Sequence, residues 1–271
     1  MAKEVNKTVR FDIELPFDDA SLEDVAYRAY QDLFSQLKRK DLHPLRFWNF
    51  VPDINKGADE HGEGDQERYK LFNRGRRKAW LEYDPSLNAI CASTCVGSHE
   101  QDIFKVSCLG TIYPVIQLEN PNQISFLDYS EKYGTPPSSR RGSLHITPEG
   151  IEVWISGTAS ITGEDNRFAG DKEPKDLAKQ LQQTLENIET LISDANLSKH
   201  YPEWQPRNLT LKELENVKVY VRNPEDIHTV HEKVEAAGIP EDETEYMEAD
   251  VCRKPLDVEI EAMIPATRTS Q

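Results

Sequence analysis

The stretch VWISGTASITGEDNRFAGD, residues Val153–Asp171, is the part of the chain from which the rest is best interpreted. It begins as a strand, because Ile151, Val153 and Ile155 alternate with less apolar residues in the period-two pattern of a pleated sheet. The small residues of GTAS follow, and Gly157 among them lets another group approach the backbone closely. A charged loop then leads to a helix. This order predicts either the floor of a pocket or a core strand followed by a turn.

The composition is that of an ordinary water-soluble protein. A chain of 271 residues can form one large or two ordinary domains. No apolar run approaches the roughly 20 residues that span a bilayer, and the N-terminus has no apolar signal region, so no membrane partner is expected. Four cysteines do not make a disulfide framework in a chain of this size, which favours a cytoplasmic location.

The charge limits the partners that the protein can have. A formal net charge of −16 argues against binding of nucleic acid, because phosphate backbones require a basic face. A small anionic substrate is still compatible with this charge if arginines cluster locally. Cys91 and Cys95 are not followed by a cysteine or histidine at a zinc-like spacing, so no metal site is expected.

The hydrophobic periodicity predicts the element order β-α-β-α-β-β twice. In the first half, the predicted strands are 8–15, 45–51, 89–96 and 103–118, and the predicted helices are 21–40 and 67–83. In the second half, the predicted strands are 151–161, 217–221, 245–251 and 256–263, with helices that begin near Pro174 and Asn223. We therefore predict an α+β fold of two similar domains, residues 1–142 and 143–271, each a sheet covered by helices on one face. A cleft is expected where the two sheets meet.

The last predicted strand carries three candidate acids. In LDVEIE, Asp257, Glu259 and Glu261 alternate with apolar residues and share one face. That face is either solvated or lines a cleft, where desolvation would raise the pKa of a carboxyl group and make it a proton donor near neutral pH. The alternation does not choose among the three. Cys252 is either a small buried hydrophobe or a nucleophile.

The arginines offer a means of binding an acidic substrate. They lie in the strand RFWNF (Arg46), in the helical run FNRGRR (Arg74, Arg76 and Arg77) and after two prolines in PPSSRRG (Arg140 and Arg141). Each group taken alone is consistent with a solvated charge run. Together they supply bidentate donors that can hold two carboxylates at once, so a small dicarboxylate is the expected substrate.

Several of these stretches resemble, in the same order, those of the chorismatases, a family of chorismate-hydrolysing enzymes. They are LRFWNFVPDIN, ERYKLFNRGRRKA, ENPNQISFLDYSEKYGTPPSSRRG, ISGTASITGEDNRFAGD and EADVCRKPLDVEIEA, and they cover most of residues 45–262. The resemblance implies two RidA/YjgF-like domains, each with a mixed sheet. It also implies cleavage of chorismate into pyruvate and a cyclic or aromatic acid, without a cofactor or metal. Family members have a longer segment before the first helix, so a shortened N-terminal domain is expected.

The resemblance also implies roles for single residues. Glu259 matches the family glutamate that protonates the substrate so that the enol-ether side chain can leave. Tyr133 matches a substrate-binding position, as does Arg141, or Arg140 if the correspondence shifts by one residue. Arg76 matches a substrate-binding arginine on the second helix.

Two further positions match pocket residues that steer the product. Cysteine at Cys252 resembles the branch that forms hydroxybenzoate, whereas alanine at Ala159 resembles the branch that forms a dihydroxy-diene acid. We expect 3-hydroxybenzoate. Two other functions fit the same fold: an enamine or imine deaminase of the RidA type, and a non-catalytic protein that binds small carboxylates. The oligomeric state stays open.

Overall fold

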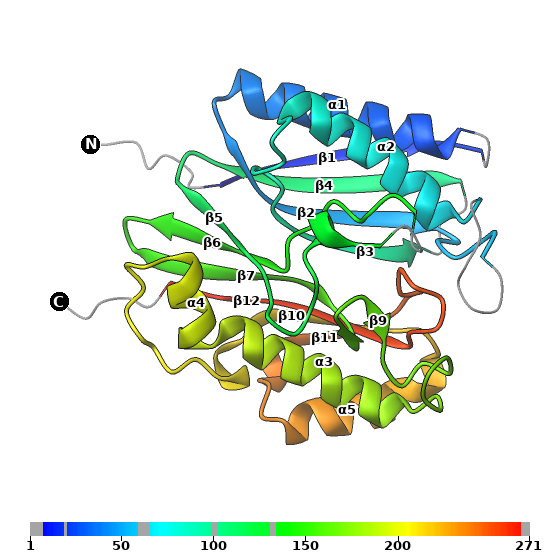
Figure 1. Ribbon diagram of the computed structural model, residues 1–271, viewed down its shortest axis with the longest axis vertical. Coiled ribbons are helices and arrows are strands. Elements are labelled where there is room, and N and C mark those ends of the chain that lie inside the picture. Colours follow the sequence, from blue (N-terminus) through cyan, green and yellow to red (C-terminus); the bar gives the residue numbers. More distant parts are fainter. Residues whose placement is uncertain (1–7, 19–20, 59–65, 99–101, 131–133, 267–271) are drawn as a thin grey trace.

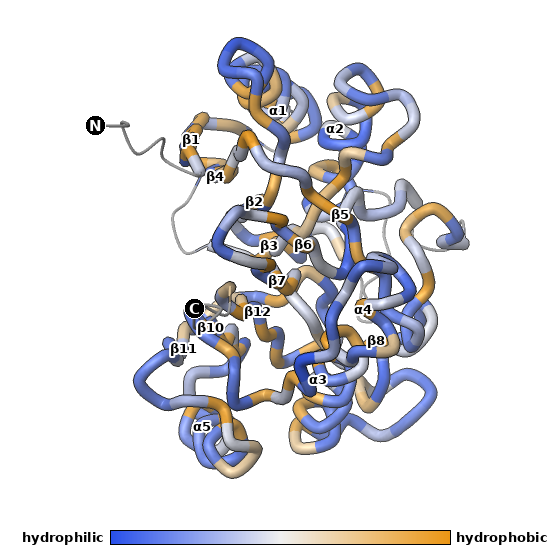
Figure 2. Tube along the Cα trace, turned by 90° about the vertical axis from the view of Figure 1, so that its left-hand side faces the viewer, coloured by the Kyte–Doolittle hydropathy of each residue, from blue (hydrophilic) through white to orange (hydrophobic). Residues whose placement is uncertain are grey.

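The computed structural model describes residues 8–18, 21–58, 66–98, 102–130 and 134–266, and it consists of four layers. Two sheets pack face to face in the middle, and helices cover their outer faces (Figure 1). A view turned by 90° shows the same stacking, with α1 and α2 at one end and α3 and α5 at the other (Figure 2). The inner faces of the sheets therefore meet at the centre of the molecule.

The first sheet and its helices come from the N-terminal half. The elements are β1 (Thr8–Pro16), α1 (Leu22–Arg39), β2 (His43–Pro52), α2 (Arg68–Tyr83), β3 (Ala92–Ser98) and β4 (Ile103–Thr111). The strand order is β1-β4-β2-β3, in which β2 and β3 are parallel and the other neighbours antiparallel. Apolar side chains of both helices and the outer sheet face form one core.

The second sheet is larger. Its elements are β5 (Val115–Leu118), β6 (Gly142–Thr147), β7 (Gly150–Thr158), α3 (Leu177–Ile192), α4 (Asp194–His200), β10 (Glu215–Val221), α5 (Ile227–Ala236), β11 (Thr244–Glu248) and β12 (Val258–Ile264). The strand order is β11-β10-β12-β7-β6-β5, and a second core lies under its helices. Short elements complete the chain: β8 (Ile161–Thr162), β9 (Asp165–Asn166), and the 3-10 turns η1 (Phe126–Asp128), η3 (Leu211–Glu213), η4 (Pro224–Asp226) and η5 (Glu241–Glu243).

The two halves repeat one topology. Read as β7-β12-β10-β11, the second sheet has the order of β1-β4-β2-β3, and both series end in a parallel pair. The predicted α+β fold of two repeated halves, with helices on one face of each mixed sheet, is therefore confirmed. β5 and β6 extend the second sheet beyond the repeat.

Two predicted details are wrong. The predicted strand over 103–118 is two strands in different sheets, because Pro114 has no N–H to continue a ladder and the chain crosses to the second sheet there. Residues 142–147 form β6, which we did not predict. The segment 115–118, expected with the first half, thus belongs to the second sheet.

None of the helices in the described part of the chain is long and apolar enough to cross a membrane.

Candidate active site

A pocket lies between the two sheets, and both halves of the chain supply its walls. The first half contributes the buried face of α2 and the strand β3, and the second half contributes the ends of β7 and β12. Residues of the described stretches 119–130 and 134–141 close one side. The lining residues that matter for the chemistry are Tyr69, Arg76, Cys95, Tyr129, Arg141, Gly157, Ala159, Cys252, Arg253 and Glu259. The small-residue stretch at the end of β7 thus lines a pocket through Gly157 and Ala159.

Glu259 is the carboxyl group at the centre of this pocket. It lies on β12 with only 3% of its surface exposed, because the first sheet covers the inner face of that strand. Burial raises the pKa of Glu259 to about 8; the neighbouring Glu261 raises it further, and Arg46 acts in the opposite direction. A carboxyl group with this pKa is mostly protonated at pH 7 and can donate a proton.

Gly157 makes room for that carboxyl group. A Cβ atom at this position would lie 1.9 Å from Oε1 of Glu259, which is far inside contact distance. The backbone N–H of Gly157 donates to Oγ1 of Thr94 on β3, at 3.0 Å, so the strand is held against the first sheet at this point. Ala159, which directly follows β7, also lines the pocket.

Cys252 approaches Glu259 but is not a nucleophile at neutral pH. Its Sγ lies 3.9 Å from Oε2 of Glu259. Burial raises the pKa of the Cys252 thiol to about 12, and the adjacent Glu259 adds to the effect. Because the thiolate is the reactive form, the protonated thiol is a small neutral group in the wall.

Arg76 brings a buried cation to the pocket. The side chain is 1% exposed, and Nη2 donates to Oδ1 of Asn73 at 2.7 Å. Its guanidinium carbon lies 4.6 Å from the centre of the Phe72 ring. Within the described residues, Nε has no hydrogen-bond partner and no carboxylate pairs with the group. A buried guanidinium without a counter-ion is costly, and an anionic ligand would satisfy it.

Arg141 is a second cation in the wall of the pocket, and its side chain is half-buried. Its Nη2 donates to the carbonyl oxygen of Ile124 at 2.9 Å and to the hydroxyl of Tyr129 at 3.0 Å. Its Nε has no partner in the described part of the chain. Both neighbours of Nη2 are uncharged in their usual state, so the charge of Arg141 is available to a ligand.

Arg253 and Tyr129 are site residues that the sequence analysis missed. Nη2 of Arg253 donates to the Tyr129 hydroxyl at 3.1 Å, and Nη1 donates to the carbonyl oxygen of Glu164 at 2.7 Å. Burial tends to raise the pKa of Tyr129, but the nearby Arg141 and Arg253 outweigh it and leave the pKa below the usual value. Their positions in the sequence could have indicated them, because Arg253 directly follows Cys252 and Tyr129 lies in the stretch ISFLDYSEKYG.

Three expected site residues lie elsewhere or cannot be placed. Arg140 does not line the pocket, because Nη1 is paired with Oε1 of Glu119 at 2.5 Å. Arg46 is paired with Oε2 of Glu261 at 2.8 Å and lines a different cavity. Tyr133 lies outside the described residues.

The three acidic residues of the last strand do not share one face. Asp257 lies just before β12, so its side chain does not follow the alternation of that strand. Its carboxylate lies 2.7 Å from the Lys175 ammonium and accepts a hydrogen bond from Nε2 of Gln180 at 3.2 Å. Only Glu259 and Glu261 face the first sheet. The described residues contain no cluster of three or more histidine, cysteine or acidic side chains suited to a metal ion.

The open space between these side chains is small, about 60 Å³. A cavity of about 150 Å³ is needed to hold benzene. A six-membered-ring substrate therefore enters only if part of the wall moves outward.

Comparisons with known proteins agree on one family. Residues 3–110 match a family model described as "Chorismatase FkbO/Hyg5-like, N-terminal". A 3-hydroxybenzoate synthase of Streptomyces hygroscopicus is 34% identical over 245 residues, which is 87% of this chain and 68% of the relative. A chorismatase of the same organism is 31% identical over 244 residues, 89% of this chain and 67% of the relative.

One solved structure is similar over nearly the whole chain. A crystal structure of a chorismatase matches with a TM-score of 0.84 and 27% sequence identity, covering 96% of this chain and 76% of the other. The chain spans about two thirds of the length of the curated relatives.

Proposed function

The chain belongs to the chorismatase family, and on that basis we propose that it cleaves the enolpyruvyl side chain of chorismate into pyruvate and a cyclic or aromatic acid. The observation that carries the proposal is Glu259, a buried carboxyl group with a pKa of about 8 in a pocket lined by Arg76 and Arg141. An acid that is neutral at pH 7 and lies beside cations suits a substrate that is a dicarboxylate and reacts by taking up a proton.

In this proposal the arginines bind and orient the substrate. Chorismate has one carboxylate on its ring and one on its side chain, and Arg76 and Arg141 would bind them. Each has an unpaired Nε among the described residues, and neither has a carboxylate partner there. Holding both ends of the substrate fixes the enol ether relative to Glu259, and orientation of this kind supplies a large part of catalysis. Arg253 and Tyr129 would keep Arg141 in place.

The proposed reaction begins with proton transfer from Glu259 to the terminal methylene carbon of the enol ether. This step forms a C–H bond and leaves an oxocarbenium ion, which the new carboxylate of Glu259 stabilises. If water adds to the cation, the resulting hemiketal breaks down to pyruvate and a dihydroxy-diene acid, and the proton of the water returns to Glu259. Formation of 3-hydroxybenzoate with pyruvate consumes no water overall.

We propose 3-hydroxybenzoate as the product, with the dihydroxy-diene acid as the alternative. Cys252 supports the first product, since a neutral thiol beside Glu259 excludes a water molecule that a smaller residue would admit. The curated relative with 34% identity is a 3-hydroxybenzoate synthase. We also propose a cytoplasmic location, in keeping with four cysteines that are all free thiols.

The test is incubation with chorismate, with pyruvate followed by a lactate dehydrogenase assay and the ring product identified by chromatography. Glu259→Gln should lower pyruvate release by about 10²–10⁴-fold, the usual contribution of a general acid. Glu245→Gln, on the exposed side of β11, makes the same chemical change away from the pocket and should leave the rate unchanged. Wild-type turnover in Glu259→Gln would remove this residue from the role. Release of ammonia from an imino acid, with no pyruvate from chorismate, would favour the deaminase.

A further inference from the structure

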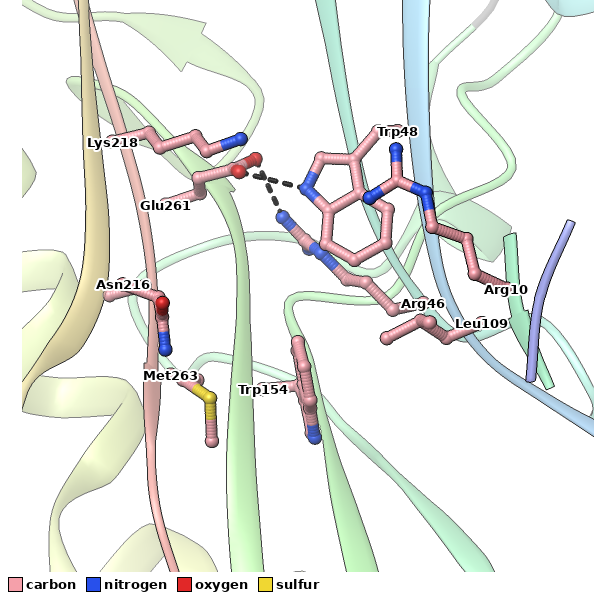
Figure 3. A pocket seen from close by; sticks show the side chains of 10 residues that line it. Arg10, Arg46, Trp48, Leu109, Trp154, Asn216, Lys218, Glu261 and Met263 are labelled. Atoms are coloured by element: carbon pink, nitrogen blue, oxygen red, sulfur yellow. Dashed lines mark hydrogen bonds and ion pairs between the residues drawn. The ribbon is translucent and has the colours of Figure 1, made fainter. Parts of the chain in front are cut away.

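A second cavity lies between the same two sheets, around Glu261 instead of Glu259. It encloses about 280 Å³ and is lined by residues of both halves (Figure 3). Trp48 comes from β2, whereas Trp154, Lys218 and Met263 come from β7, β10 and β12. The pocket proposed for chorismate has none of these residues in its wall.

One part of this cavity suits a flat apolar group. The rings of Trp48 and Trp154 meet edge to face with their centroids 6.3 Å apart, and the side chain of Met263 lies across the cavity from Trp154 in Figure 3. Aromatic groups pack well against such surfaces. A cavity of about 150 Å³ holds benzene, so 280 Å³ has room for a six-membered ring with small substituents.

The other part of the cavity is positively charged. Lys218 is the cross-strand neighbour of Glu261, yet it forms no ion pair with any residue that the structure describes. Both carboxylate oxygens of Glu261 are already used, by Nη2 of Arg46 and by Nε1 of Trp48, each at 2.8 Å. Arg46, with 1% exposure, keeps Nη1 without a hydrogen-bond partner among the described residues. In a chain of net charge −16, this is a local site for an anion.

We propose that this cavity is a second binding site, which takes a small aromatic carboxylate of the hydroxybenzoate class. The ring lies against the two indoles and the carboxylate is bound by Lys218. The class of ligand follows from the cavity alone. Its identification with the reaction product rests on the proposed function.

Binding here would affect the acid in the first pocket. Glu261 is two residues from Glu259 on the same face of β12, and Arg46 acts electrostatically on Glu259 while it is bonded to Glu261. A ligand carboxylate beside Lys218 and Arg46 adds a negative charge close to Glu261 and Glu259. Coupling between the binding free energies of two sites is reciprocal. If a ligand in the second cavity alters Glu259 and so the binding of substrate, substrate in the first pocket changes the affinity of the second cavity by the same factor.

The experiment is a titration of the purified protein with 3-hydroxybenzoate, followed by tryptophan fluorescence. Lys218→Gln should weaken binding about tenfold or more, as expected for the loss of a charge-assisted hydrogen bond. Trp154→Leu should also weaken binding, because it removes one of the two indoles against which the ring lies. Lys199→Gln, which removes an exposed lysine at the end of α4, is the matched control and should bind like the wild type. Arg141→Gln, which alters the first pocket, should leave this titration unchanged.

3-Hydroxybenzamide has the same ring and hydroxyl group but no charge, and it should bind much more weakly than 3-hydroxybenzoate. The proposal is overturned if 3-hydroxybenzoate does not bind, if Lys218→Gln binds it as well as the wild type, if 3-hydroxybenzamide binds equally, or if Arg141→Gln abolishes binding. The titration needs no turnover. A protein that binds the ligand but releases no pyruvate from chorismate would therefore refute the proposed function and not this site.

Discussion

Glu259 owes its high proton affinity to the first sheet, which covers the face of β12 where its side chain lies. Alternation alone is also explained by a solvated face of LDVEIE. The cover is formed by β2 and β3, which are more than 150 residues away in the chain. The result is a carboxyl group that is desolvated and next to a second carboxylate, and both conditions favour its neutral form.

The pH dependence of turnover follows from this pKa. The reactive form of Glu259 is the protonated one, so kcat/KM should be constant below the folded-state pKa and should fall tenfold per pH unit well above pH 8. The profile of pyruvate release from pH 6 to 10 measures this. A decline of tenfold per pH unit already between pH 6 and 7 would mean that Glu259 has an ordinary pKa and is not the acid.

Gly157 provides a second test at the scale of one residue. Gly157→Ala places a methyl group where Oε1 of Glu259 lies, so the acid is displaced and activity should fall by about 10²-fold or more. Aspartate at position 259 is one methylene shorter and leaves room for that methyl group. Gly157→Ala should therefore cost much less activity in a Glu259→Asp background than in the wild type. Equal losses in the two backgrounds would show that Gly157 acts on something other than Glu259.

The individual site residues were predictable only in part. The resemblance selected Glu259 among three carboxylates, whereas the cause of its raised pKa is the cover by the first sheet, which only the structure shows. Arg253 and Tyr129 were missed because they meet across 124 residues of sequence, and no local pattern marks such a contact. Arg46 was expected to bind substrate, yet the structure shows it bonded to Glu261.

At the scale of elements, Gly75 explains how α2 carries Arg76 into the pocket. A Cβ atom at position 75 would lie 2.0 Å from the carbonyl oxygen of Glu23, so the glycine lets α2 approach the backbone of α1. The cost of a helical glycine, about 1 kcal/mol relative to alanine, is offset by this close packing. The glycine of FNRGRR thus serves the packing of the two helices.

Gly75→Ala should accordingly destabilise the protein although alanine is the better helix former. We expect a loss of about 1–3 kcal/mol in the free energy of unfolding, since the new methyl group overpacks a backbone contact. Urea denaturation measures it. Leu81→Ala, on the exposed side of the same helix, is the control and should change stability by about 0.5 kcal/mol or less. An unchanged or higher midpoint for Gly75→Ala would contradict the close approach of the two helices.

Elements with strong periodicity were predictable, and the junction between the halves was not. The helix predicted over 67–83 is α2, Arg68–Tyr83, and the predicted strand 8–15 is β1. The chain between Thr111 and Gly150 was less clear, because β5 and β6 are short and their pairing depends on the second sheet. A strand that crosses to another sheet has the same local sequence pattern as one that continues.

At the scale of the whole molecule, both proposed sites exist only because two similar sheets face each other. Arg76 and Glu259 come from different halves, as do Trp48 and Trp154. The layer between the sheets is unusually polar, with Arg46, Glu259 and Glu261 all 3% exposed or less. Arg46 and Glu261 form an ion pair between the two halves, and separation of the halves would leave each charge without its partner, so the two halves should unfold together.

The ion pair between Arg46 and Glu261 tests this view of the interface. Arg46→Met leaves Glu261 buried without its cation, and Glu261→Gln leaves Arg46 without its anion while still accepting a hydrogen bond from Trp48. Each single change should lower the free energy of unfolding by about 3–5 kcal/mol, the cost of an uncompensated buried charge. The double variant removes both charges, so it should be more stable than either single variant. Additive losses in a double-mutant cycle measured by urea denaturation would show that the two charges do not depend on each other, and that the halves are held together by the apolar contacts alone.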